Sequence, residues 1–159
     1  MIQILPDRFE DGPARLMGGI RRHLAMADAT REIPDIWQAL VATGALDNAK
    51  DDTAYGIICQ SDLQAGTFEY MAAVEVDDLQ AWPANGRLRL PAAHYAVFTH
   101  PGPGSTIKDT YAHIWQDWLP NSDFKAAPTP NFERYGPGYD PATNSGDIEI
   151  WIAVTPVQA

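Results

Sequence analysis

The chain has 159 residues, a formal net charge of −10 and a hydrophobic fraction of 45%, with five Trp, six Tyr and five Phe. This length fits one compact domain or two half-domains that share a core, and we predict a single domain over residues 1–159. The excess of negative charge argues against direct nucleic-acid binding, because such binding draws most of its affinity from neutralising phosphates. No segment approaches the length of uninterrupted apolar sequence that crosses a membrane.

The start of the chain and its cysteine content indicate a cellular compartment. Residues Met1 to Arg8 lack the basic start and the long apolar stretch of a signal peptide. The single cysteine, Cys59, excludes an internal disulfide framework and fits a reducing environment. We therefore expect a cytoplasmic protein without a membrane partner.

Two stretches of the chain follow the same pattern, which predicts internal repeats over about residues 13–78 and 86–156. Four groups of identical residues recur in the same order at a step of 78 or 80 positions. The matches are Pro13-Ala14 with Pro91-Ala92, Ile36-Trp37-Gln38 with Ile114-Trp115-Gln116, Tyr55-Gly56 with Tyr135-Gly136, and Glu69, Ala73 and Val74 with Glu149, Ala153 and Val154. Four groups of matching residues in the same order, at a nearly constant sequence spacing, are not expected by chance.

In the first repeat we predict a strand over residues 14–24, in which Gly18 and Gly19 mark a weak point or a bulge. A helix begins near Pro34, because proline is favoured at the first helical position, and Gly44 is a plausible stop. Two strands follow, over residues 54–60 and 67–76.

The second repeat opens with an Asn85-Gly86 turn signal. Thr106, followed three residues later by Asp109, is a capping signature for a helix that ends near Pro120. The predicted segments are strands over 86–90 and 93–99, a helix over 106–118, and strands over 130–135 and 147–154. Between the last two strands, turn residues predict a surface loop, which is either an ordinary connection or a flap over a pocket.

Each repeat therefore consists of a strand, a helix and two further strands. Runs of strands with one helix per repeat are typical of the α+β class. We expect the two β-α-β-β units to join into one curved antiparallel sheet, with two helices on one face.

The last predicted strand carries a carboxylate and an indole on the same face, because side chains alternate along a strand. Glu149, Trp151 and Ala153 share this face, and the opposite face is entirely β-branched and typical of core. An exposed Trp is unusual, so this face indicates a place where another molecule approaches. Glu69 and Met71 occupy the matching positions in the first repeat, although a glutamate on a strand usually faces water. Which of the two glutamates is the main charge partner stays open.

The second predicted helix has an aromatic stripe. Ile107, Tyr111, Ile114, Trp115 and Trp118 fall within an arc of roughly 100°. Most of such a stripe packs as core, but three large aromatic residues exceed what packing against a sheet requires, and Tyr and Trp carry polar groups that need partners. Tyr111, Trp115 and Trp118 are therefore candidates to line a cavity.

A carboxylate set among aromatic rings is a physical receptor for an organic cation. Each ring face attracts a cation by roughly 0.5–2 kcal/mol, and a buried carboxylate without a partner is destabilising by several kcal/mol. A cationic ligand supplies the missing charge, and ring faces do not demand one ligand shape. The net charge also favours cations, although solubility alone is an ordinary reason for it.

Several segments together resemble the GyrI-like, or AraC-type effector-binding, domain family. They are Phe68 to Val74, Leu90 to His100, Thr110 to Pro120, Asn131 to Tyr135 and Asp147 to Val154. The resemblance spans nearly the whole chain and is strongest from about residue 54 onward. It implies a duplicated β-α-β-β, SHS2-like fold with a central pocket for small molecules, often cations in multidrug-binding members.

The resemblance also implies roles for residues. A glutamate in the last strand is the family's typical charge partner, and Glu149 stands at that position. Aromatic residues on the second-repeat helix and the neighbouring strands typically line the pocket. The predicted ligand-binding residues are thus Glu149, Trp151, Tyr111, Trp115, Trp118, Phe98, Tyr95 and Met71. Ala153 and Thr155-Pro156 depart from the Ile-Pro-Val ending of many relatives, so the end of this strand is expected to differ.

The leading functional hypothesis is a module that binds small cationic, amphipathic, drug-like molecules and acts as a sensor, a sequestering protein or a ligand-controlled regulatory partner. Many relatives carry a DNA-binding helix-turn-helix, but about a dozen residues precede the first predicted strand, and we expect no DNA-binding domain. The alternative is a gyrase-inhibitor-type module that binds a protein partner, such as a regulator or gyrase. A small-molecule hydrolase is less favoured. We expect no cofactor and no metal site, and the oligomeric state stays open.

Overall fold

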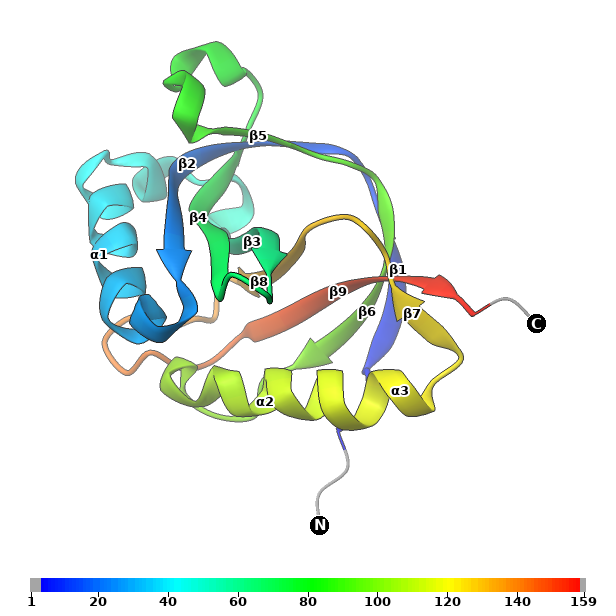
Figure 1. Ribbon diagram of the computed structural model, residues 1–159. Coiled ribbons are helices and arrows are strands. Elements are labelled where there is room, and N and C mark those ends of the chain that lie inside the picture. The colour runs from blue at the N-terminus through cyan, green and yellow to red at the C-terminus, as the bar shows by residue number, and fades with distance from the viewer. Residues whose placement is uncertain (1–3, 158–159) are drawn as a thin grey trace.

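The computed structural model describes residues 4–157, so the ends of the predicted 1–159 domain lie outside the described residues. One antiparallel sheet curls into a half-barrel, and helices pack against it (Figure 1). This arrangement confirms the predicted α+β class with a curved antiparallel sheet and two main helices. Within residues 4–157, no helix is both long and apolar enough to cross a membrane.

The strands are β1 (Arg8–Gly12), β2 (Arg15–Ala25), β3 (Ala54–Asp62), β4 (Thr67–Val76), β5 (Arg87–Leu90), β6 (Ala93–Thr99), β7 (Phe124–Ala126), β8 (Asn131–Tyr135) and β9 (Ile148–Pro156). The helices are α1 (Ala29–Ala42), α2 (Ile107–His113) and α3 (Leu119–Asn121), and a π-helical turn (Ile114–Trp118) joins the last two. The predicted strands agree with these to within two residues at each end.

Strands β1 and β7 are absent from the sequence-based prediction, which placed the first strand about a dozen residues into the chain. β1 is an edge strand, largely exposed, and its residues Arg8-Phe-Glu-Asp-Gly12 include three charged side chains. A strand with little buried surface gives no alternating apolar signal. β7 has only three residues, which is too short for such a signal.

The order of strands across the sheet is β1-β6-β9-β8-β3-β4-β2-β5, and β7 pairs with the far end of β9. The two repeats meet at the central β3–β8 pair, with β4 and β2 on one side and β9 and β6 on the other. β1 precedes β2 in the chain but pairs with β6, and β5 precedes β6 but pairs with β2. The halves therefore share three strand pairings, and separating them would break all three.

The two faces of the sheet have different roles. α1 packs over β2 and β4, and α2 packs over β6 and β9, so both helices cover the same face. The opposite, concave face encloses a core of its own, centred on Tyr55, Phe132 and Trp151. Its curvature is strong: the Arg15 guanidinium of β2 lies 5.8 Å from the Trp151 ring of β9, although three strands separate β2 from β9 in the sheet.

The face of the sheet on which each tyrosine lies tests the match of Tyr55 with Tyr135 in the sequence repeat. Tyr55 lies in the concave core, whereas the neighbouring pair Ala54 and Tyr135 faces the helices, where Tyr135 contacts Trp37 of α1. Because a rotation that relates two halves of one sheet keeps each residue on its face, Tyr55 and Tyr135 are not structural equivalents. Their match in sequence is a coincidence of spacing.

Both helices differ in detail from the prediction. α1 begins at Ala29 rather than near Pro34, and Pro34 lies inside it, where it removes one helical hydrogen bond. Burial of Ile36 and Leu40 against the sheet offsets this loss. The Thr106 hydroxyl does not cap α2 but donates to the carbonyl oxygen of Pro103 at 2.9 Å.

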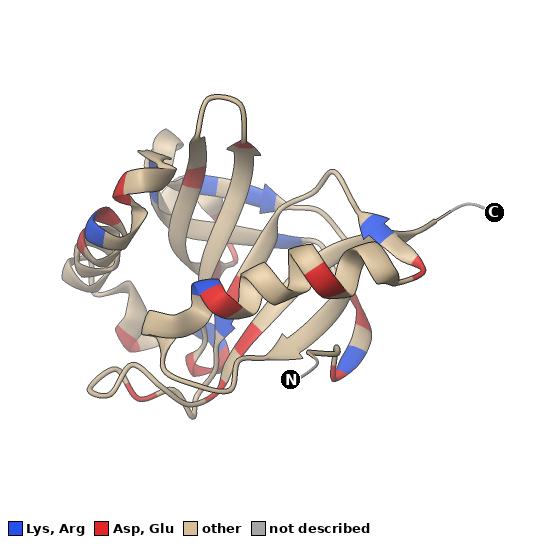
Figure 2. Cartoon of the chain, turned by 60° about the horizontal axis from the view of Figure 1, so that its bottom comes forward, with Lys and Arg blue, Asp and Glu red and all other residues tan. Residues whose placement is uncertain are grey.

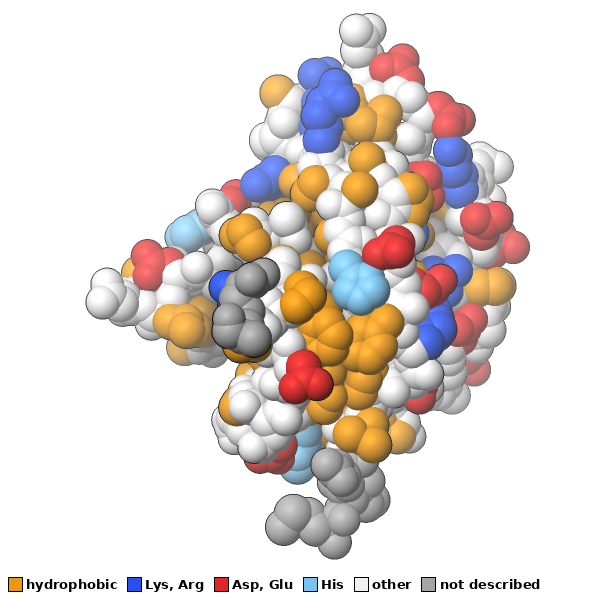
Figure 3. All heavy atoms as spheres, turned by 90° about the vertical axis from the view of Figure 1, so that its right-hand side faces the viewer, with side chains coloured by type: hydrophobic (Ala, Val, Ile, Leu, Met, Phe, Trp, Pro, Cys, Tyr) orange, Lys and Arg blue, Asp and Glu red, His pale blue; other side chains and the backbone are white. Residues whose placement is uncertain are grey.

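Acidic and basic residues are scattered over helices, strands and loops, and the basic residues do not gather on one face in this view (Figure 2). On the side of the molecule near β1 and β7, apolar side chains gather around a histidine (Figure 3). Phe9 is 40% exposed and stacks on Phe124 at 4.9 Å and on His94 at 5.8 Å. Both Phe9 and Phe124 also lie beside Trp118, on the face of the sheet that α2 covers.

The Gly18-Gly19 pair does not form a bulge, because the β2–β4 register runs without a shift from Leu16 to Ala25. The two glycines are needed for close approach instead. A Cβ at Gly19 would lie 2.0 Å from the carbonyl oxygen of Ala72, and a Cβ at Gly18 would lie 2.4 Å from the Trp82 indole nitrogen.

We predict that Gly19→Ala lowers the free energy of unfolding by about 3 kcal/mol, because the new methyl group meets backbone that cannot move independently. Gly18→Ala should cost about 1 kcal/mol, since the Trp82 side chain can turn aside. Chemical denaturation of both variants measures the difference. Equal losses would contradict this account of the two glycines.

Candidate functional site

A buried carboxylate lies at the centre of the face that the helices cover. Glu133 of β8 is 6% exposed. Its neighbours across the sheet are Gly56 of β3 and Ile150 of β9, and Ile150 packs with residues of α2. Glu133 therefore points into the angle between α1 and α2.

Three tyrosine hydroxyls donate to this carboxylate. Tyr135 donates to Oε1 at 2.7 Å and Tyr70 to the same oxygen at 3.4 Å, while Tyr111 donates to Oε2 at 3.0 Å. Tyr135 lies two residues along β8, Tyr70 is on β4, and Tyr111 is on α2. The donors thus come from both halves of the protein, and the contact depends on the whole fold.

Further aromatic residues surround these tyrosines. The Trp37 indole N–H of α1 donates to the Tyr70 hydroxyl oxygen at 3.0 Å, and the Trp37 ring meets Tyr135 edge to face at 5.4 Å. Tyr139, in the loop after β8, contacts the Tyr135 ring at 4.9 Å. We call Glu133, Tyr70, Tyr111, Tyr135, Trp37 and Tyr139 the tyrosine–glutamate cluster.

A glycine makes room for the cluster. Gly56 lies opposite Glu133, and a Cβ there would lie 2.2 Å from the Tyr70 hydroxyl and 2.8 Å from Glu133 Oε1. Any side chain at this position would displace one of the two groups. The lack of a side chain at Gly56 of β3 therefore leaves the space that Glu133 and the Tyr70 hydroxyl occupy.

Loop residues 136–147 lie over one side of the cluster through Tyr139. The loop is tied internally: Asp147 accepts from the Gly138 amide at 3.0 Å, and the Tyr139 hydroxyl donates to Asn144 at 2.6 Å. The Asn144 carbonyl accepts from the Gly104 amide at 2.7 Å, which links the loop to the segment before α2. The loop thus spans the same angle between the helices that Glu133 faces.

The electrostatics of the cluster are unbalanced. Within residues 4–157, no Lys, Arg or His nitrogen lies within 4 Å of the Glu133 carboxylate. Burial raises the pKa of Glu133 above its ordinary value of 4.5, and the hydroxyls of Tyr135, Tyr111 and Tyr70 oppose this rise. In its ionised form this carboxylate is solvated by three hydroxyl groups, with no cationic nitrogen of residues 4–157 within ion-pair distance.

The tyrosines remain hydrogen-bond donors. Burial, reinforced by the negative charge of Glu133, raises the pKa values of Tyr70, Tyr111 and Tyr135 well above 10. They stay protonated at any physiological pH, so each keeps the proton that it donates to Glu133. The arrangement suits charge stabilisation rather than proton transfer.

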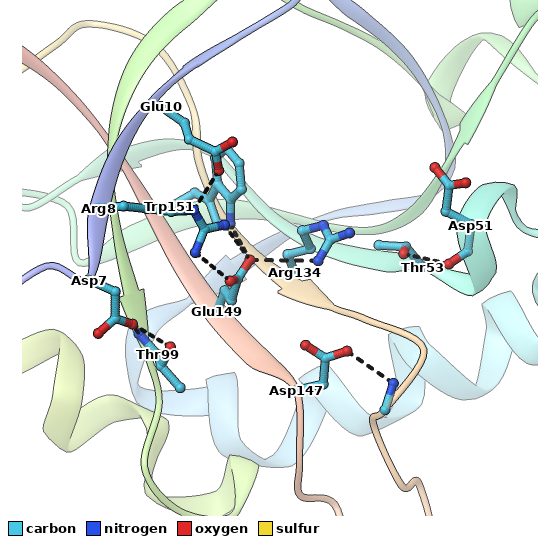
Figure 4. Close-up of polar contacts among 11 residues, drawn as sticks. Asp7, Arg8, Glu10, Asp51, Thr53, Thr99, Arg134, Asp147, Glu149 and Trp151 are labelled. Atoms are coloured by element: carbon cyan, nitrogen blue, oxygen red, sulfur yellow. Dashed lines mark hydrogen bonds and ion pairs between the residues drawn. The ribbon is translucent and has the colours of Figure 1, made fainter.

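Glu149, the charge partner expected from the sequence, lies on the concave face instead. Its side chain is 14% exposed and accepts from Arg8 at 2.9 Å, while Arg134 lies 3.6 Å away and the Trp151 indole N–H donates at 3.1 Å (Figure 4). The concave face is the one that the helices do not cover. Two arginines already balance this carboxylate.

The matching glutamate of the first repeat is also neutralised. Glu69 on the concave side of β4 pairs with Arg21 at 3.3 Å and accepts from the Gln60 amide. Both carboxylates found from the strand pattern are thus paired with arginines. The Glu133 carboxylate differs from them, because no ion pair joins it to a Lys, Arg or His of residues 4–157.

The other predicted site residues are divided among three places. Tyr111 joins the tyrosine–glutamate cluster. Tyr95, Met71 and Trp151 pack in the concave core. Phe98 and Trp118 pack edge to face at 5.0 Å between the second helix and the sheet, and Trp115 is 38% exposed on the outer side of that helix.

Sequence reasoning missed Glu133, Tyr70, Tyr135, Trp37 and Tyr139 as site residues. A partial signal was present, because Glu133 and Tyr135 share a face of their strand in the way that Glu149 and Trp151 do. The position of β8 at the centre of the sheet, with its outer face between the helices, is what places the first pair in the candidate site. The central position of β8 follows from the order of strands in the sheet, which the local residue pattern does not predict.

Comparison with known proteins gives the family. Residues 10–154 match the model of the Cass2 family, integron-associated effector-binding proteins. The chain belongs to this family. The match confirms the resemblance to GyrI-like effector-binding domains that the sequence segments indicated. The family is described by the binding of effectors, not by a reaction.

Individual relatives of the Cass2-family chain are more distant. Transcriptional regulator BrlR of Pseudomonas aeruginosa is 28% identical over 107 residues, which cover 65% of this chain and 38% of BrlR. The chain thus spans less than half of that regulator. SAV2435 in its complex with tetraphenylphosphonium has a TM-score of 0.71 and 21% identity, with 93% of each chain covered. An integron cassette protein of Vibrio cholerae has a TM-score of 0.68 and 20% identity, with 96% and 98% covered. These two structures establish a shared fold.

The raised pKa of Glu133 predicts how the stability of the protein depends on pH. In the folded state the pKa of Glu133 is raised, so the folded protein binds this proton more tightly than the unfolded chain does. Stability contributed by Glu133 therefore falls as the pH rises from the ordinary glutamate pKa through the raised one. Glu133→Gln should raise the free energy of unfolding at pH 7.5 and have little effect at pH 4. Denaturant titrations at the two pH values measure this, and a variant that is less stable at pH 7.5 would contradict it.

Proposed function

We propose that this protein binds hydrophobic organic cations in the angle between α1 and α2, with Glu133 as the countercharge. The observation that carries the proposal is a buried carboxylate with three hydroxyl donors, an aromatic surround and no cationic partner within residues 4–157. A cation placed there would gain the full attraction of a carboxylate in a medium of low polarity. The binding of tetraphenylphosphonium by SAV2435, which shares the fold, supports the same choice of ligand.

The hydrogen bonds of Glu133 also select the kind of cation. Both carboxylate oxygens already accept hydroxyl protons, so few lone pairs remain for a ligand N–H group. A primary ammonium would lose its hydration without regaining its hydrogen bonds. A quaternary or delocalised cation has no N–H bonds to satisfy and can lie against the rings of Trp37, Tyr135 and Tyr139.

Entry of such a ligand requires the cluster to open, because Glu133 is buried in the structure described. The Tyr139 loop and the segment before α2 are connected through the Asn144–Gly104 hydrogen bond. We propose that these two segments move together when the ligand enters. Binding at Glu133 would then change the surface around loop 136–147, which is how a sensor or a ligand-controlled regulatory module could report its ligand.

We propose binding without catalysis. Burial raises the pKa of the Cys59 thiol to about 11, so the only cysteine is not a nucleophile at neutral pH. The cluster tyrosines hold their protons, and three of them donate to the carboxylate that they surround. These features support a receptor rather than a hydrolase.

We predict that tetraphenylphosphonium quenches the tryptophan fluorescence of the protein with a Kd in the micromolar range, about −8 kcal/mol. Glu133→Gln keeps the shape of the side chain and removes its charge, and should weaken binding about tenfold or more. Glu149→Gln is the matched control on the neighbouring strand and should change the Kd by less than about twofold. A loss confined to Glu149→Gln would return the charge-partner role to Glu149.

We further predict that affinity for tetraphenylphosphonium rises with pH and then levels off. The cation binds the ionised carboxylate, and in the empty site the raised pKa of Glu133 keeps part of the protein protonated near and above the ordinary glutamate value. Titrations at pH 5, 6, 7 and 8 in one salt concentration measure the trend. The Glu133→Gln variant should bind with the same low affinity at each pH, and an unchanged pH trend in the variant would assign the proton to another group.

A further inference from the structure

A second feature with unbalanced charge lies on the opposite side of the sheet, at the concave face. The Arg15 guanidinium carbon lies 5.7 Å from the Tyr55 ring centre and 5.8 Å from those of Phe132 and Trp151. Arg15 comes from β2, while these rings come from β3, β8 and β9. The side chain therefore extends across the inside of the half-barrel and lies over a floor of three aromatic rings.

Arg15 has no counter-ion in the part of the chain that the structure describes. No carboxylate oxygen there lies within 4 Å of it, and none of its N–H groups donates to a side chain or a carbonyl oxygen within residues 4–157. Other arginines of the concave face are paired: Arg8 and Arg134 with Glu149, and Arg21 with Glu69. Arg15 differs from them because its charge has no such partner within residues 4–157.

The position of Arg15 is also fixed in advance. Attraction to the ring faces favours one conformation of its flexible side chain. Ligand binding would therefore lose little further conformational entropy of that side chain. Its charge is felt inside the core, where it lowers the pKa of Tyr95 against the larger effect of burial. Arg8 contacts the same ring, with its guanidinium carbon 5.6 Å from the Trp151 ring centre, but its charge is paired with Glu10 and Glu149.

We propose that Arg15 forms a second binding site, on the concave face, for small organic anions that carry a carboxylate group. A guanidinium with free N–H donors matches a carboxylate through two parallel hydrogen bonds. The apolar rings around it favour an organic anion over a strongly hydrated inorganic one. This site is separate from Glu133, because the concave and helix-covered faces lie on opposite sides of the sheet, and it does not depend on the function proposed for Glu133.

The test is a titration of the full chain with sodium benzoate at constant ionic strength, followed by NMR of the arginine Nε–H groups. The Arg15 signal, identified by its absence in Arg15→Met, should shift saturably with a Kd of about 1 mM. Arg15→Met keeps an apolar stem over the rings and should weaken binding, measured calorimetrically, by about tenfold or more. Arg15→Lys keeps the charge but not the fork, and should bind more weakly than the wild type.

Arg22→Met is the matched control, because Arg22 is an exposed arginine on the same strand. It should leave benzoate binding unchanged. Circular dichroism and the affinity for tetraphenylphosphonium report whether the Arg15 variants keep the fold and the other site. Absence of saturation, equal binding by the wild type and Arg15→Met, or tighter binding of inorganic phosphate than of benzoate would each overturn the proposal.

Discussion

The central physical constraint of this structure is a carboxylate buried among tyrosine hydroxyls, with no Lys, Arg or His nitrogen of residues 4–157 within 4 Å of it. Glu133 is solvated by Tyr70, Tyr111 and Tyr135, which belong to β4, α2 and β8. Hydroxyl groups can make burial of a carboxylate tolerable, but they cannot neutralise it. The folded protein therefore retains an electrostatic demand that a cation of the right shape can meet.

The strand order explains how both halves of the chain contribute to that one group. β3 and β8 are central in the sheet, so the outer side of β8 lies between the two helices, and Gly56 on β3 leaves space for Glu133 and the Tyr70 hydroxyl. The exchanged edge strands β1 and β5 hold the halves together at the sides. On the concave face Glu149 is paired with two arginines, whereas Arg15 has no carboxylate partner within residues 4–157. The two sides of the sheet thus each carry one charged group without an ion-pair partner among those residues.

Local pattern was enough to predict most of the fold. Alternation of apolar residues predicted the inner strands, such as β4 and β9, because each has a buried face, and the family resemblance supplied their arrangement. Alternation did not predict β1, because most residues of that strand are charged and exposed. The start of α1 was also misplaced, because packing of Ile36 and Leu40 outweighs the preference of Pro34 for the first turn of a helix. The site was harder, since Glu149 and Glu133 have equally suggestive local patterns. Only the long-range pairing with Arg8 and Arg134 distinguishes a neutralised glutamate from an uncompensated one.

The most direct test of the central claim is to locate a bound cation by its own scattering. Tetraphenylarsonium has the shape and charge of tetraphenylphosphonium, and its arsenic atom gives an anomalous signal in a crystal of the complex. The account predicts a single strong peak between α1 and α2, beside the Glu133 carboxylate and the rings of Trp37 and Tyr135. A peak on the concave face beside Glu149 and Trp151, with the tyrosine–glutamate cluster still closed, would contradict it.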